Sequence, residues 1–139
     1  MEINGLSFAG HSGLIKRTVK FASGFEKKII GVVEINLVSS DEIKRLNRIY
    51  RGQNKVTDVL SFAWNEEAII KTKILGQLYI SPLKIKSQAK EFDVPENEEF
   101  VRMLAHGLLH LVGYEHAKNK QAKRMFDLQE KIVRNVLNK

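Results

Sequence analysis

Hydrophobic residues recur along the chain at two spacings. In the first, apolar positions lie three or four residues apart, as Phe21 and Phe25 do, which is the spacing of one face of a helix. This spacing predicts helices over about 11–24, 39–50, 82–92, 97–112 and 117–137.

The second spacing is the alternation of apolar and polar residues that is typical of a half-buried strand. Val33, Ile35 and Leu37 alternate with polar residues inside 29–38. Further strands are predicted over 59–64 and 74–80, joined as a long hairpin. Because helices and strands do not follow a strict βαβ order, we expect one α+β domain over 1–139, in which helices cover a small mixed sheet of three to four strands.

Residues at the expected helix ends support these boundaries. Ser39 and Glu42 have the spacing of a capping box, and Ser81 followed by Pro82 is a good helix start. Gly113 suits the position just after a helix, where the backbone turns left-handed.

The helix over 97–112 is the most apolar of the chain, which predicts a central, buried position. It also carries His106 and His110, whose spacing places both imidazoles on one face, one turn apart. A turn at Gly113 would bring His116 back toward the same point. Three neutral nitrogen donors can hold one metal ion and leave a fourth tetrahedral position open for water or substrate.

Zinc is the natural choice for a site of three imidazoles, although nickel or copper would also bind such ligands in vitro. The alternative is that these are ordinary histidines with hydrogen-bond partners, because a polar group in a core is costly unless it is satisfied. His11, alone near the N-terminus, is expected to be a surface or capping residue.

The spacing is similar to the metzincin protease motif, H-E-x-x-H-x-x-G-x-x-H. Those proteases carry a general-base Glu after the first His, whereas this chain has Gly107. A zinc peptidase is therefore disfavoured, and Gly107 is expected to serve close packing of a core helix.

Composition excludes several other classes. The chain contains no Cys, so it has no disulfide scaffold, thiolate metal site or cysteine nucleophile. No apolar run approaches the roughly 20 residues that span a bilayer. The first residues lack the basic-then-apolar order of a signal peptide, so we expect a cytoplasmic protein without a membrane partner.

The net charge of +7 is compatible with a polyanionic partner or with solubility alone. Its distribution is more informative: residues 44–55 hold five basic side chains and no acidic one, and residues 117–139 hold seven against two. These basic segments lie, in sequence, around Arg51 and after the histidine helix, which favours a nucleic-acid-binding surface beside the metal site. A solvated face remains the alternative for the last helix.

Three motifs resemble the YbeY family of bacterial rRNA maturation factors, in the right order and at the right separations. They are HGLLHLVGYEH over 106–116, YRGQNKVTDVLSF over 50–62 and ILGQLYIS over 74–81. Three residues depart from the family pattern: Val56 replaces a Pro, Gln77 an Asp, and Glu115 an Asp. We assign no chemical role to Gln77.

The resemblance implies a metal-dependent, single-strand-specific endoribonuclease of rRNA maturation, notably at the 3′ end of 16S rRNA, and of ribosome quality control. It implies one zinc ion per chain with His106, His110 and His116 as ligands, and a family arginine at Arg51. It also implies rRNA and the ribosome or ribosomal proteins as partners.

Arg51 is the best candidate to bind the scissile phosphate, because its planar fork matches two phosphate oxygens. The general base stays open: Glu115 could act or could support a ligand, and metal-bound hydroxide or the RNA 2′-OH could replace it. Either substrate positioning or loop capping could explain the set Thr57, Asp58 and Ser61. Tyr114 could stack on a base or pack at the helix end. The competing function is a non-catalytic ribosome-assembly factor that binds RNA and holds a structural metal.

Overall fold

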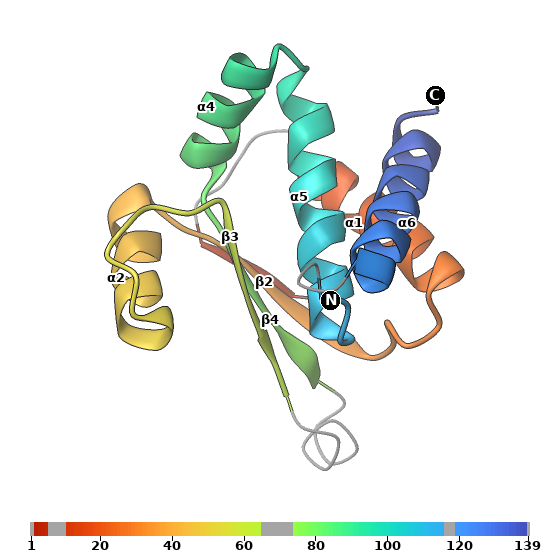
Figure 1. Cartoon of the computed structure of the whole chain (residues 1–139), viewed down its shortest axis with the longest axis horizontal. Helices are drawn as coiled ribbons and strands as arrows, with labels where there is room; N and C mark the ends of the chain where they lie inside the picture. The colour runs from red at the N-terminus through yellow and green to blue at the C-terminus, as the bar shows by residue number, and fades with distance from the viewer. Residues whose placement is uncertain (1, 6–10, 65–73, 116–118, 139) are drawn as a thin grey trace.

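The computed structural model describes residues 2–5, 11–64, 74–115 and 119–138. Its sheet contains β1 (Glu2–Gly5), β2 (Val32–Leu37), β3 (Val59–Ala63) and β4 (Ile74–Ile80). The spatial order is β1-β2-β4-β3, with β1, β2 and β4 parallel and β3 antiparallel to β4 (Figure 1). The expected small mixed sheet is therefore confirmed, and β1 is a strand that the hydrophobic pattern did not predict.

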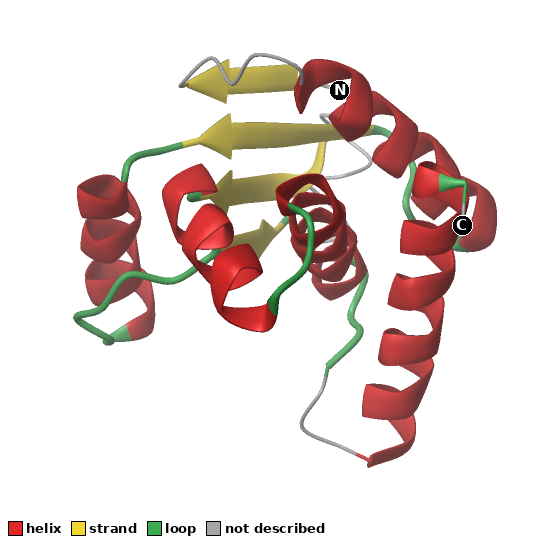
Figure 2. Ribbon diagram, turned by 90° about the horizontal axis from the view of Figure 1, so that it is seen from above, coloured by secondary structure: helices red, strands yellow, loops and turns green. Residues whose placement is uncertain are grey.

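Five helices accompany the sheet in the described part of the chain: α1 (His11–Phe25), α2 (Ser40–Arg51), α4 (Pro82–Phe92), α5 (Glu96–Leu111) and α6 (Asn119–Leu137). α2 packs on one side of the sheet and shares a small apolar cluster with Leu60. The other four helices share the main core with the opposite side, where α5 lies close to both the sheet and α6 (Figure 2). Within the described residues, no helix has both the length and the apolar character needed to cross a membrane.

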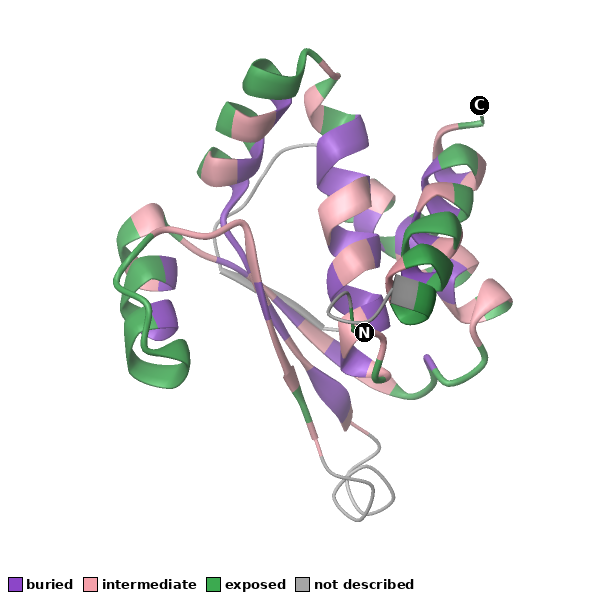
Figure 3. Ribbon diagram, viewed as in Figure 1, coloured by how far each residue is buried: buried purple, intermediate pink, exposed green. Residues whose placement is uncertain are grey.

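The strand pattern follows the predicted alternation. Along β2, Val33, Ile35 and Leu37 are buried in the main core, whereas the residues between them are partly exposed (Figure 3). β3 lies at the edge of the sheet, so no strand of the described residues pairs with its other side. This edge becomes part of the site described below.

α5 is the central helix that its apolar composition predicts. Leu104, Ala105 and Leu108 are fully buried, and Gly107 packs directly against the sheet. A Cβ atom built on Gly107 would lie 3.1 Å from Leu78 Cδ2 and 3.1 Å from Val59 Cγ2. Close packing of Gly107 is thus confirmed, and it holds the histidine-bearing helix against β3 and β4.

The helix ends largely follow the predicted signals. The Ser39 side chain accepts a hydrogen bond from the Glu42 amide at 3.1 Å. The Glu42 carboxylate, which a full capping box would direct to the Ser39 amide, forms an ion pair with Arg45. Ser81 caps α4, and Gly113, with φ of +98°, turns the chain after α5.

Candidate active site

A cleft of about 390 Å³ lies where α5, edge strand β3 and the C-terminal end of α2 meet. Arg51, His106 and His110, which are distant in the sequence, all line this cleft. Its wall is completed by residues of β3 and of the segment before it: Thr57, Asp58, Val59, Leu60 and Ser61.

His106 and His110 approach each other directly across one turn of α5. Their Nε2 atoms are 3.0 Å apart, and their rings meet edge to face with an interplanar angle of 85°. Both residues are partly exposed to the cleft. The prediction that this spacing brings the two ring nitrogens together is confirmed.

The hydrogen bond of the His110 ring fixes its tautomer. His110 Nδ1 lies 2.8 Å from the backbone carbonyl oxygen of Tyr114. Because a carbonyl oxygen can only accept, Nδ1 carries the proton of the neutral ring, and the lone pair of Nε2 points toward His106.

The tautomer of His106 is fixed by a side chain of α6. His106 Nδ1 lies 2.8 Å from Gln129 Oε1. The Gln129 amide is itself oriented, because its nitrogen donates to the Glu130 carboxylate at 3.2 Å. Gln129 therefore presents its oxygen to His106, whose Nδ1 donates, and the lone pair of Nε2 faces His110.

Two nitrogen lone pairs that face each other at 3.0 Å cannot share a hydrogen bond without an added proton. A metal cation between them suits this arrangement, because neutral imidazole nitrogens are zinc ligands. In a tetrahedral zinc site with Zn–N bonds of about 2.0–2.1 Å, two nitrogens lie roughly 3.3 Å apart. The pair therefore fits a transition-metal ion. In the part of the chain that the structure describes, no three His, Asp or Glu residues cluster as a metal site, and the expected third ligand, His116, lies outside that part.

Arg51 reaches the cleft from the last turn of α2. Its Nη2 donates to the carbonyl oxygen of Ser61 on the free edge of β3 at 2.6 Å. Its guanidinium also lies 4.8 Å from the centroid of the Phe62 ring, a cation–π distance. A guanidinium has five N–H donors, so the bond to Ser61 leaves others that can bind an anion.

Three polar residues line the cleft and also form hydrogen bonds within its wall: Thr57, Asp58 and Ser61. The structure is therefore compatible with both substrate positioning and loop capping. Asp58 accepts from the amide of Val59 at 2.8 Å and from the Thr57 hydroxyl at 3.3 Å. The Ser61 hydroxyl donates to the carbonyl oxygen of Gly107 at 3.2 Å, which ties β3 to α5 beside His106.

Tyr114 is anchored at the end of α5, as the packing alternative predicts. Its hydroxyl donates to the Glu26 carboxylate at 2.5 Å. This hydrogen bond is the main cause of the raised pKa of Tyr114 and of the lowered pKa of Glu26. Glu115 is exposed, and His11 begins α1. The structure does not describe the side chain of His11, so its expected surface or capping role stays a prediction.

Comparison with known proteins identifies relatives of the whole fold. Residues 7–137 match the family model described as Endoribonuclease YbeY. The chain is 43% identical to the Endoribonuclease YbeY of Thermotoga maritima over 113 residues, covering 79% of this chain and 72% of that protein. It is 42% identical to the protein of the same name from Persephonella marina over 128 residues, covering 86% and 84%. A solution structure of a Thermotoga maritima protein matches with a TM-score of 0.64 and 38% identity, over 98% of this chain and 89% of that one.

Proposed function

Because the chain belongs to the YbeY family of endoribonucleases, we propose that it is a metal-dependent endoribonuclease that cleaves single-stranded RNA. The processed molecule would be rRNA, notably the 3′ end of 16S rRNA, and the role would include ribosome quality control. One observation supports the metal-dependent chemistry above all: two imidazole Nε2 atoms converge in the cleft that Arg51 also lines.

We propose zinc as the ion, one per chain, held by His106, His110 and His116. When bound, such an ion polarises a phosphoryl oxygen or lowers the pKa of a bound water molecule toward 7. The two described imidazoles are already oriented for this task, since each Nδ1 donates to a protein oxygen. Both Nε2 atoms therefore face the position that the ion would take, which reduces the reorganisation that binding requires.

Arg51 would bind the scissile phosphate and stabilise the charge that develops on its oxygens. Its bond to the Ser61 carbonyl and its contact with Phe62 hold the guanidinium at the cleft. Among the described residues, the structure favours no side chain as the general base. Asp58 is a carboxylate on the cleft wall, but both of its oxygens already accept hydrogen bonds, from the Val59 amide and from Gln88 among others. The RNA 2′-OH remains a candidate nucleophile.

Packing disfavours the peptidase alternative. A Cβ at Gly107 would already lie 3.1 Å from both Leu78 and Val59, so the longer side chain of a glutamate would have to displace these two side chains. A ribosome-assembly factor with a structural metal is the remaining alternative. An RNA substrate of this kind would place the protein in the cytoplasm, with the ribosome or ribosomal proteins as partners.

The test compares four samples on a defined single-stranded RNA: wild type, wild type after chelation, Arg51→Ala and Lys86→Ala. We expect chelation to stop cleavage and Arg51→Ala to reduce it by about 10²–10³-fold without loss of metal or fold, the range observed when a charge-stabilising donor is removed. Lys86→Ala is the control, because it removes one positive charge from an exposed position of α4. Equal cleavage by all four samples would indicate a contaminating nuclease and would favour the assembly factor.

A further inference from the structure

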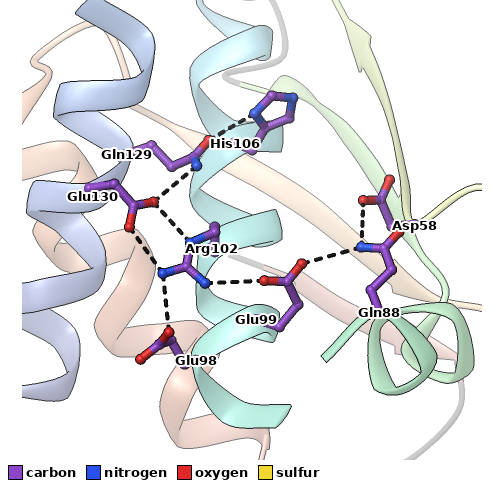
Figure 4. Close-up of polar contacts among 8 residues, drawn as sticks. All are labelled: Asp58, Gln88, Glu98, Glu99, Arg102, His106, Gln129 and Glu130. Carbon is purple, nitrogen blue, oxygen red and sulfur yellow. Dashed lines mark hydrogen bonds and ion pairs between the residues drawn. The ribbon is translucent and has the colours of Figure 1, made fainter. Parts of the chain in front are cut away.

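Arg102 lies on α5, one turn before His106, and its side chain lies between α5 and α6. Arg102 is only 20% exposed, and its guanidinium contacts three carboxylates (Figure 4). It binds Glu130 of α6 in a bidentate manner, at 2.9 and 3.0 Å. It also donates to Glu99 at 3.1 Å and to Glu98 at 3.2 Å, both on its own helix. We call these four side chains the Arg102 network.

The first branch of the network leads to the metal ligand. Glu130 uses one oxygen, Oε2, to accept from Arg102 and from the amide nitrogen of Gln129. Gln129 is 94% buried, and its own oxygen accepts from His106. Since the Gln129 amide can turn over, its contact with Glu130 decides whether it offers an acceptor or a donor to the imidazole.

The second branch leads to the other end of the cleft wall. Glu99, which is 3% exposed, accepts from the amide nitrogen of Gln88 on α4 at 3.3 Å. The same nitrogen donates to Asp58 at 3.2 Å. An amide nitrogen has two hydrogens, so Gln88 can serve both carboxylates and hold them apart. Figure 4 shows the continuous chain of contacts from His106 to Asp58.

Stability alone does not account for this arrangement. Burying charged groups carries a desolvation cost that their attraction must repay, and an apolar cluster of similar size is often as stable. Burial works to raise the pKa of Glu130, yet the hydrogen bonds from Arg102 and Gln129 outweigh it and lower that pKa. The hydrogen bonds with Glu130 and Glu99 raise the pKa of Arg102, so the guanidinium stays charged. The network is therefore a fixed ionic structure whose two branches both end at the cleft.

We propose that Arg102 is a positioning residue for the cleft, acting on His106 through α6 and on Asp58 through α4. On the first branch it keeps the His106 ring in the Nδ1–H tautomer, with Nε2 directed to the metal. On the second branch it keeps the Asp58 carboxylate in place beside β3. The inference deepens the proposed function, on which its relevance to RNA cleavage rests.

The first experiment removes the acceptor next to His106 and leaves every charge in place. Gln129→Met keeps the length of the side chain but cannot accept from Nδ1. Gln121→Met is the matched control, since Gln121 is an exposed glutamine on the same helix. We expect the zinc affinity, measured by calorimetric titration, to fall by about 10–100-fold in Gln129→Met and to be unchanged in the control.

A direct readout of the tautomer accompanies this titration. Long-range ¹H–¹⁵N correlation spectra of the metal-free protein, at a pH where imidazoles are neutral, report which ring nitrogen carries the proton. We expect Nδ1–H for His106 in wild type and in Gln121→Met, and a large Nε2–H population in Gln129→Met. An Nε2–H ring in wild type, or no change in Gln129→Met, would overturn the first branch.

Two further variants test the arginine itself and the second branch. Arg102→Lys keeps the charge but loses the planar fork, so we expect a tautomer shift and weaker zinc binding with the protein still folded by circular dichroism. Gln88→Met should leave zinc affinity and the His106 tautomer unchanged while kcat on RNA falls by about tenfold, as misplacement of a group near the reacting atoms would cause. Zinc affinity and tautomer equal to wild type in folded Arg102→Lys would contradict the positioning role. Unchanged kcat in Gln88→Met would contradict the second branch.

These outcomes separate the inference from the proposed function. Tautomer and zinc affinity are measured without RNA, so they decide the first branch even if wild-type protein cleaves no RNA. Absence of RNA cleavage by metal-loaded wild type would instead reject the proposed function, and with it the second branch.

Discussion

His106 and His110, the two described ligands of the proposed metal site, are supported in different ways. Each lies on α5, and each directs Nε2 toward the other. His110 is oriented by a backbone carbonyl only four residues further along the chain. His106 is oriented by the side chain of Gln129, which is 23 residues away on another helix.

The difference shows which part of the fold each ligand depends on. The support of His110 is local, since the turn at Gly113 returns the Tyr114 carbonyl to the helix that it has just left. The support of His106 is tertiary and exists only when α6 is packed against α5. A substitution at one side chain can therefore remove the partner of His106, whereas no substitution of Tyr114 removes its carbonyl.

Loss of either ligand should have the largest effect, and the effect should be equal for both. We expect His106→Ala and His110→Ala each to abolish stoichiometric zinc, because a site of three imidazoles loses a third of its donors. Elemental analysis of protein purified without added metal measures this directly. Retention of one zinc per chain in either variant would remove that histidine from the site and end the equivalence.

Gly107→Ala tests the contact between the sheet and α5, the helix that carries both histidines. The added methyl would lie 3.1 Å from side chains of β3 and β4, so Val59 and Leu78 must give way by a few tenths of an ångström. We expect the free energy of unfolding to fall by about 1–3 kcal/mol, the usual cost of overpacking a core. Urea denaturation measures it, and Gly24→Ala, in open space on α1, is the control. A loss no greater than in the control would mean that the contact with the strands is loose.

Much of this arrangement could be predicted from the sequence, because it depends on local periodicity. The spacing of His106 and His110 and the basic loop at Arg51 identified three residues that the fold brings into one cleft. β1 was not predicted, because its four residues, EING, are too few to show a recognisable alternation of apolar and polar positions. The position of His116 lies outside the described residues, so its role stays a prediction.

The supporting residues could not be predicted, because they pair across distant helices. Arg102 and Glu130 are 28 positions apart, and no periodicity indicates which residues of α5 and α6 face each other. A weak signal did exist: Gln129 lies on the apolar stripe of α6, between Met125 and Ile132, where a buried amide needs a partner.

Tyr114→Phe tests whether His110 depends on a distant side chain, and it should affect zinc affinity less than Gln129→Met does. It removes the hydroxyl that binds Glu26 but keeps the carbonyl that orients His110. We expect zinc affinity to change by less than about threefold, well below the loss in Gln129→Met. Calorimetric titration of both variants under the same conditions compares them. A loss in Tyr114→Phe as large as in Gln129→Met would show that His110 also depends on a distant side chain.

The smallest expected effect is on the free energy of unfolding at acidic pH. The Tyr114 hydroxyl lowers the pKa of Glu26 from its usual 4.5, so the folded state favours the ionised carboxylate. This contribution is present above the unfolded pKa and is lost as pH falls through the lower folded value. Wild type should therefore lose slightly more stability than Glu26→Gln on acidification below about pH 4.5. The free energy of unfolding of both proteins is measured by urea denaturation at several pH values. An equal fall in the two proteins on acidification would contradict this prediction.

RNA cleavage by this chain should depend on an ion held by the α5 histidines. The most direct measurement compares wild type and His110→Ala on a single-stranded RNA that carries the 16S rRNA 3′ end, with metal content determined for each sample. Wild type should cleave in proportion to its zinc content, and folded His110→Ala should contain no zinc and should not cleave. Cleavage by zinc-free His110→Ala at the wild-type rate would contradict this dependence.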